Sequence, residues 1–231
     1  MSSKDWTSRT GDRIDMTEDS QVDPGPEQAL GTRDKILQAA ARLFHEQGYT
    51  GTGVATILRE AGVHTGSLYH FFGTKDDLLR AVLKQYEEWL EPVVLGPVEA
   101  SEPDPLERVF ALLDWYRAGM VETGCRLGCP LGNLALELSD THPEIRPHID
   151  VNLKNWRAGI RRWLEEAGDR LPADCDRDAL SYFVLTVMEG GLLQARSAGD
   201  LAPFDASVAV LRDHFGRLVR QAERYSTERN T

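Results

Sequence analysis

The chain has 231 residues, of which 41% are hydrophobic, and a formal net charge of −11. This apolar content is sufficient for a buried core, but no run of about 18 apolar residues occurs, so no membrane-spanning helix is expected. Residues 1–20 lack the apolar segment of a secretory signal, and the three cysteines do not form a disulfide framework. These features favour a cytoplasmic protein.

Both ends of the chain are expected to be tails. Residues 1–28 are polar, acidic and interrupted by Pro24-Gly25-Pro26, which is typical of a flexible segment. Residues 225–231 form a second, shorter tail. The structured part is therefore expected between these two segments.

Residues 32–91 carry a helical pattern that stops and restarts at short intervals. Apolar residues at helical spacing predict a first helix that ends at Gly48, and Thr52 is placed to cap a short helix over residues 54–60. The turn at residues 61–63 separates it from a second short helix. Two short helices joined by a glycine-containing turn are typical of a DNA-binding helix-turn-helix, here within residues 29–73.

The second short helix has small and hydrogen-bonding residues on its outer side, a face that suits a DNA major groove. The next helix is expected to begin with Thr74 as N-cap and Asp77 as its capping partner. Its free N–H groups and Lys75 form an end suited to phosphate. The residues predicted to contact DNA are Thr52, Gly53, His64, Thr65, Gly66, Ser67, Tyr69, His70 and Lys75.

The distribution of charge agrees with contact at one end only. Residues 28–80 carry six basic and five acidic residues, whereas the segments on either side are strongly acidic. An acidic body repels DNA, so contact is confined to the helix-turn-helix segment.

The sequence GTGVATILREAGVHTGSLYHFFGTKDDLL, at residues 51–79, resembles the DNA-binding domain of the TetR family of bacterial transcriptional regulators. Leu58 departs from the small alanine of many members. The resemblance implies an all-α fold: an N-terminal three-helix helix-turn-helix domain, then a helical effector-binding and dimerisation domain at residues 74–224. It also implies a homodimer on double-stranded operator DNA and a small-molecule effector.

Beyond residue 73 the pattern is helical throughout, with no strand-like alternation. A linking helix from Thr74 is expected to end at Glu91-Pro92. Further helices are expected at residues 105–122, 131–139, 143–167, 176–197 and 204–220. In TetR-like regulators the last two helices pair with a second copy, and the resemblance places Tyr182, Leu193, Leu211, Phe215 and Leu218 at this interface.

The segment TGCRLGCPLGNLALE at residues 123–137 is open to several interpretations. It is a plain interhelical loop with buried cysteines, or it holds a reactive thiol at Cys129, whose pKa a helix N-terminus would lower. GCPLGNLALE also resembles a segment of TetR-like repressors, some of which respond to electrophiles. No further ligand lies at metal-binding spacing, so a metal site is not expected.

A non-covalent pocket is the default for effector binding. Its expected lining is Trp89, Trp115, Tyr116, Met120, Cys125, Cys129, Asn133, Trp156, Phe183 and Met188, although each of these residues also fits an ordinary core. No glycine-rich phosphate loop or nucleophile elbow is present, so neither an enzyme nor a cofactor is expected. The sequence predicts a repressor released by an effector, with thiol sensing through Cys129 as the alternative.

Overall fold

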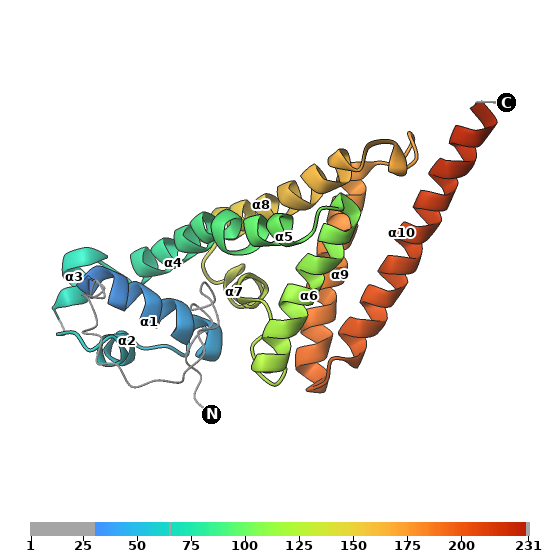
Figure 1. Cartoon of the computed structure of the whole chain (residues 1–231). Helices are drawn as coiled ribbons and strands as arrows, with labels where there is room; N and C mark the ends of the chain where they lie inside the picture. Colours follow the sequence, from blue (N-terminus) through green and yellow to red (C-terminus); the bar gives the residue numbers. More distant parts are fainter. Residues whose placement is uncertain (1–30, 65, 230–231) are drawn as a thin grey trace, which may run out of the picture.

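The computed structural model describes residues 31–64 and 66–229, and every regular element in these residues is helical (Figure 1). The expected all-α fold is confirmed. The predicted N-terminal tail lies outside the described residues. None of the described helices is both long enough and apolar enough to cross a bilayer.

Three N-terminal helices, α1 (Thr32–Gln47), α2 (Val54–Glu60) and α3 (Ser67–Phe71), pack around one small core. Ile36, Ile57 and Leu68 are fully buried there because the apolar faces of all three helices meet. Helix α4 (Lys75–Trp89) packs on α1 and continues into the rest of the molecule. Its predicted cap is confirmed, because the Asp77 amide donates to Thr74 Oγ1 at 3.0 Å.

The α-helix ends at Trp89 with Leu90 as its C-cap, within one residue of the end predicted at Glu91-Pro92, but no loop follows it. The chain continues through a π-helical turn, η1 (Leu90–Leu95), into α5 (Gly96–Ser101). The wider π turn relieves the clash of a proline ring with the carbonyl four residues earlier. Burial of Leu90 and Leu95 stabilises the continuation.

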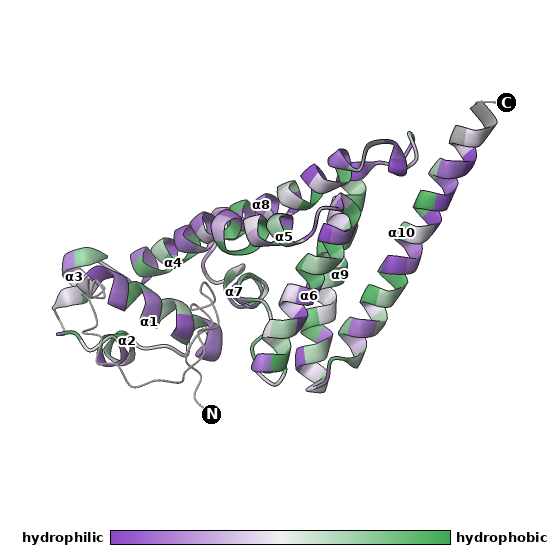
Figure 2. Cartoon of the chain, in the orientation of Figure 1, coloured by the Kyte–Doolittle hydropathy of each residue, from purple (hydrophilic) through white to green (hydrophobic). Residues whose placement is uncertain are grey.

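The remaining elements are α6 (Pro105–Glu122), α7 (Pro130–Leu138), α8 (Arg146–Glu166), a short 3-10 turn η2 (Gly168–Arg170), α9 (Arg177–Ala198) and α10 (Ala202–Arg229). Helix α9 packs against α6, α8 and α10, and α7 lies between α1 and α8 (Figure 1). Figure 2 shows hydrophobic and hydrophilic residues alternating along α10, as in an amphipathic helix.

The last helix, predicted to end at residue 220, extends to Arg229, so the expected tail from residue 225 is largely helical. No glycine or proline occurs between Gly216 and Arg229 to stop the helix. Ala222 is still buried one turn before the predicted tail.

Candidate functional site

The surface predicted to contact DNA is formed by α3 and the residues just before it. Leu68 is fully buried and anchors the helix, whereas Tyr69 is 64% exposed and His70 is exposed beside it. His64 and Gly66 are also exposed, and Ser67 is partly buried. Thr65 lies outside the described residues. Four of the predicted contact residues, His64, Gly66, Tyr69 and His70, are therefore exposed.

Thr52 was predicted to cap α2 and to contact DNA, and its side chain does neither. It is fully buried, with its hydroxyl 2.6 Å from the Gly48 carbonyl oxygen and 3.2 Å from that of Leu43. The α2 N-cap is the exposed Gly53, which has no side-chain cap. The Thr52 hydroxyl instead donates to carbonyl groups at the end of α1. This hydrogen bonding offsets the cost of removing the hydroxyl from water.

Lys75 is directed toward the protein rather than outward. Its ammonium donates to the Tyr49 carbonyl oxygen at 2.6 Å and lies 4.0 Å from the centre of the Tyr49 ring. Burial lowers the pKa of Lys75. A phosphate contact by this ammonium would have to compete with the contacts to Tyr49.

Helix α7 contacts the N-terminal three-helix unit directly, an arrangement that was not predicted. Glu137 accepts hydrogen bonds from the amides of Tyr49 at 2.9 Å and Thr50 at 2.6 Å, in the turn between α1 and α2. Burial opposes its ionisation, but these amide bonds and the nearby Lys75 charge outweigh burial and lower the pKa of Glu137. No local pattern marks Glu137, because its partners are distant in sequence.

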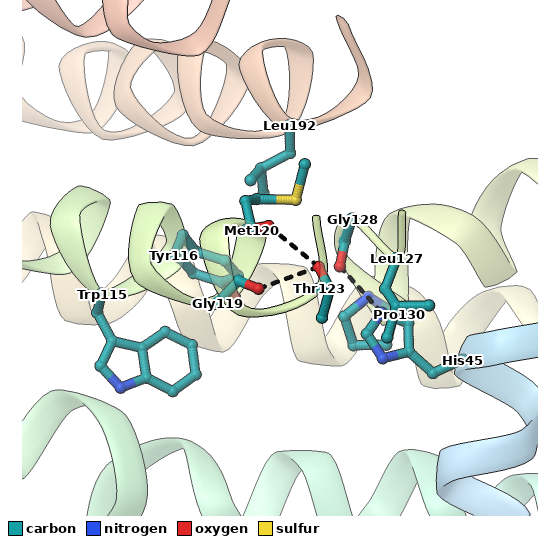
Figure 3. Close-up of a pocket in the computed structure, with 10 residues that line it drawn as sticks. All are labelled: His45, Trp115, Tyr116, Gly119, Met120, Thr123, Leu127, Gly128, Pro130 and Leu192. Carbon is teal, nitrogen blue, oxygen red and sulfur yellow. Dashed lines mark hydrogen bonds between the residues drawn. The ribbon is translucent and has the colours of Figure 1, made fainter. Parts of the chain in front are cut away.

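A second contact joins the other end of this segment to α1. His45 Nε2 lies 2.9 Å from the Gly128 carbonyl oxygen, to which it donates, just before α7 begins (Figure 3). The His142 ring, after α7, packs edge-on against Tyr49 with centroids 5.3 Å apart. The α7 segment thus holds the end of α1 and the turn after it at three points, through Gly128, Glu137 and His142.

A cavity of about 20 Å³ lies between the end of α6, the loop before α7, and α9. Trp115, Tyr116 and Met120, all predicted pocket residues, line it together with His45 and Leu192 (Figure 3). This volume holds about one water molecule. In this conformation the cavity has no room for a molecule much larger than water.

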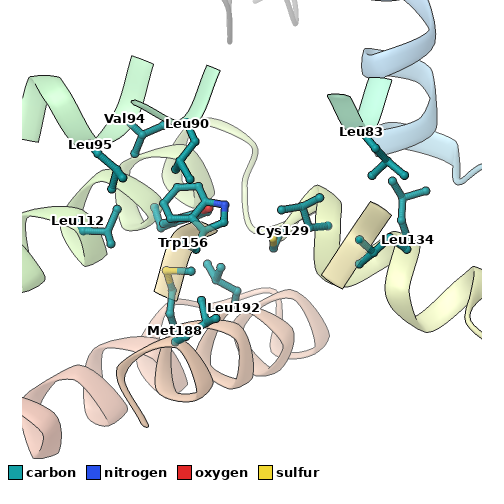
Figure 4. Close-up of a cluster of buried hydrophobic side chains, with 14 of the residues drawn as sticks. Leu83, Leu90, Val94, Leu95, Leu112, Cys129, Leu134, Trp156, Met188 and Leu192 are labelled. Atoms are coloured by element: carbon teal, nitrogen blue, oxygen red, sulfur yellow. The ribbon is translucent and has the colours of Figure 1, made fainter. Parts of the chain in front are cut away.

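The other predicted pocket residues are distributed differently. Trp156 packs on Tyr116 with centroids 5.3 Å apart, and Met188 is buried in the adjoining core (Figure 4). Cys125 lines a separate open depression near Arg117 and Asp205.

The remaining predicted pocket residues line neither hollow. Trp89 is partly buried at the end of α4, and Asn133 donates to the Leu127 carbonyl and accepts from Arg196. Phe183 is 44% exposed. The assignment of Phe183 to the pocket is wrong, because it points out of the core beside His214.

Cys129 is the N-cap of α7, as expected, but the expected fall in its pKa is wrong. The thiol is 4% exposed among apolar side chains (Figure 4) and accepts from the Gly132 amide at 3.5 Å. Burial and the neighbouring Glu189 charge raise its pKa well above the usual value, because both disfavour the thiolate. These two effects outweigh the helix N-terminus, which by itself would lower the pKa of the thiol.

A buried, protonated thiol predicts slow alkylation. Under native conditions at neutral pH, iodoacetamide should modify Cys129 at least about tenfold more slowly than it does in the urea-unfolded chain. Mass spectrometry of tryptic peptides at timed intervals measures both rates. Equal rates in the two states would restore the reactive-thiol interpretation.

Two of the predicted interface residues are interior to the single chain. Leu211 is fully buried and Phe215 is 3% exposed, with the Phe215 ring edge-on to Phe110 at 5.4 Å. Their assignment to a dimer contact is wrong, because this stripe of α10 faces α6 and α9. Leu218 is partly buried against the same core. Tyr182 and Leu193 are each 52% exposed in the single chain.

Comparison with known proteins agrees with this architecture. Residues 36–82 match the family model of bacterial regulatory proteins of the tetR family, and residues 105–211 match the tetracyclin repressor-like C-terminal domain. The HTH-type transcriptional regulator LmrA of Bacillus subtilis is 32% identical over 180 residues, covering 74% of this chain and 90% of LmrA. The transcriptional regulator AcuR of Cereibacter sphaeroides is 29% identical over 193 residues, covering 83% and 88%.

Solved structures agree as well. The crystal structure of a regulatory protein TetR from Rhodobacter sphaeroides has a TM-score of 0.72 and 28% identity, covering 80% of this chain and 97% of that one. Reduced NemR of E. coli, at 22% identity and a TM-score of 0.70, covering 79% and 96%, shares the fold. The chain belongs to the TetR family of bacterial transcriptional regulators, with a helix-turn-helix DNA-binding domain and a helical C-terminal domain.

Proposed function

We propose that this protein is a homodimeric repressor that leaves a palindromic operator when a small molecule enters the cavity between α6, α7 and α9. The observation that carries the proposal is the position of α7. Its N-terminal side adjoins the cavity, and its C-terminal side holds the α1–α2 turn through Glu137. A single short helix therefore contacts both the effector site and the DNA-binding domain.

The closed cavity supplies the physical reason for switching. A ligand larger than water must move α6, α9 or the segment before α7, because about 20 Å³ is available. Movement of that segment acts on His45 through the Gly128 contact, and movement of α7 acts on Tyr49 and Thr50. An effector that binds the opened state better shifts the population toward a changed helix-turn-helix orientation.

The dimer is proposed to form through exposed apolar residues of α9 and α10. Tyr182, Phe183, Leu193 and Val210 are 52%, 44%, 52% and 69% exposed. Apolar side chains that the single chain leaves in water stabilise an interface by their burial. A two-fold dimer matches a palindromic operator only when its recognition helices are about 34 Å apart, the spacing of successive major grooves.

The proposal is tested by operator binding and sedimentation. DNA from upstream of the gene should shift in a gel with the purified protein at nanomolar concentration, and sedimentation should show a dimer at micromolar concentration. A stable monomer, or absence of any specific DNA site after selection from a random library, would refute the proposed function.

Tyr69→Ala is expected to weaken operator binding by about tenfold or more, the effect of losing a base contact. Tyr69 is exposed, so the thermal midpoint and the dimer should be unchanged. Fluorescence anisotropy with labelled operator measures the affinity. Phe71→Ala, at another exposed position of α3, is the comparison variant, and equal loss in both would assign the effect to helix stability.

A further inference from the structure

The geometry around Glu189 points to an effector that is an amphipathic organic cation, with an amine or ammonium group bound by the Glu189 carboxylate and an apolar body against the Tyr116 and Trp115 rings. This inference rests on the proposed function and deepens it by naming the ligand chemistry. It follows from the position of the Glu189 carboxyl, from the lack of a cationic partner for it among the described residues, and from the aromatic rings beside it.

The Glu189 carboxyl extends from α9 to the first turn of α7. A Cβ added at Gly132 would lie 2.5 Å from Glu189 Oε2, so the glycine leaves the space that the carboxyl occupies. The Cys129 thiol is close enough to the carboxyl that each group shifts the pKa of the other. Leu192, one turn further along α9, lines the cavity. The partly buried Glu189 carboxyl therefore lies at the first turn of α7, where Pro130 lines the proposed effector cavity.

Glu189 has no cationic partner among the residues that the structure describes. Asp104 and Asp205 pair with Arg170 and Arg117, and these arginines lower the pKa of each carboxyl. Burial instead raises the pKa of Glu189. A buried acid without a counter-charge is costly to ionise, and a bound cation offsets that cost.

Aromatic rings form the walls on the side of the cavity. Tyr116 is buried and close enough to Glu189 that the carboxylate charge contributes to the raised pKa of Tyr116. The Trp115 and Trp156 rings lie 5.1 and 5.3 Å from the Tyr116 ring. Aromatic faces attract a desolvated cation, whereas an anion would be repelled by Glu189. The same walls provide the apolar contact for the rest of the ligand.

Three probes of one shape separate the charges: benzylamine, benzyl alcohol and benzoate. Their dissociation constants for the dimer are measured by calorimetry at pH 7.5, and operator affinity is measured in parallel with and without each probe. Benzylamine should bind wild type at least about tenfold more tightly than benzyl alcohol, should weaken operator binding, and benzoate should bind most weakly. Glu189→Gln should remove the preference for benzylamine while retaining the affinity for benzyl alcohol.

Glu88→Gln, which removes an exposed carboxylate of α4, is the matched control and should behave as wild type. Gly132→Ala should displace the carboxyl and reduce benzylamine binding as well, without loss of the fold. Tighter binding of benzoate, equal binding of all three probes, no binding of any, or a preference for benzylamine that survives Glu189→Gln would each overturn the inference. Failure to bind operator in the absence of probe would refute the proposed function instead.

Discussion

Phe215→Asp is expected to unfold the protomer, although the family resemblance had placed Phe215 at the dimer interface. Phe215 is 3% exposed and packs edge-on against Phe110. Loss of a buried phenylalanine costs about 3–5 kcal/mol, and an unpaired buried carboxylate adds to that cost. A domain is stable by only about 5–15 kcal/mol, so the variant should be largely unfolded in circular dichroism.

Phe215→Ala keeps the prediction measurable if the aspartate variant cannot be purified. Its free energy of unfolding in urea should fall by about 3–5 kcal/mol, extrapolated for a dimer at stated concentration. Leu193→Asp is the matched contrast, because Leu193 is 52% exposed on α9. It should yield a helical monomer in sedimentation. Dissociation of Phe215→Ala without loss of protomer stability would show that Phe215 belongs to the interface.

Glu137→Ala is expected to uncouple the effector domain from DNA. The substitution removes the acceptor of the Tyr49 and Thr50 amides, while water can replace it at the exposed Thr50 bond. The free energy of unfolding should therefore change little, whereas the coupling between α7 and the DNA-binding domain should be lost. In wild type, operator binding should slow hydrogen exchange of α7 amides at least about tenfold, because coupling between two sites is reciprocal. In Glu137→Ala the exchange of α7 should be the same with and without operator.

Leu136→Ala is the control for this experiment, since Leu136 lies on the same helix and is 74% exposed. It should retain the wild-type response to operator. If operator binding slowed α7 hydrogen exchange in Glu137→Ala as much as in wild type, the signal would pass through α4 instead.

The Glu137 contacts also depend on pH. Because the pKa of Glu137 is lowered from 4.5, its stabilising contribution is complete above that value and is lost as pH falls through the lowered pKa.

Local sequence chemistry was sufficient for a defined part of the molecule. The Thr74–Asp77 cap depends on residues three apart, and the exposed Tyr69 beside the buried Leu68 follows from helical spacing. Prediction failed where a local rule met a distant contact. The linking α-helix ended before Pro92 as predicted, but the chain continued as the π turn η1, in which Leu90 and Leu95 are buried. Thr52 became a core residue because the end of α1 required a donor.

The sequence by itself determined the all-helical fold and the helix-turn-helix, because these depend on spacings within a few helical turns, and the resemblance of residues 51–79 indicated the family. Only the tertiary structure decided which apolar stripe of α10 is core and which face is free, since both have the same period. It also decided that Cys129 is protonated and beside Glu189, and that Glu137 joins α7 to the α1–α2 turn. Burial and charge at these sites come from residues far apart along the chain, which no local pattern encodes.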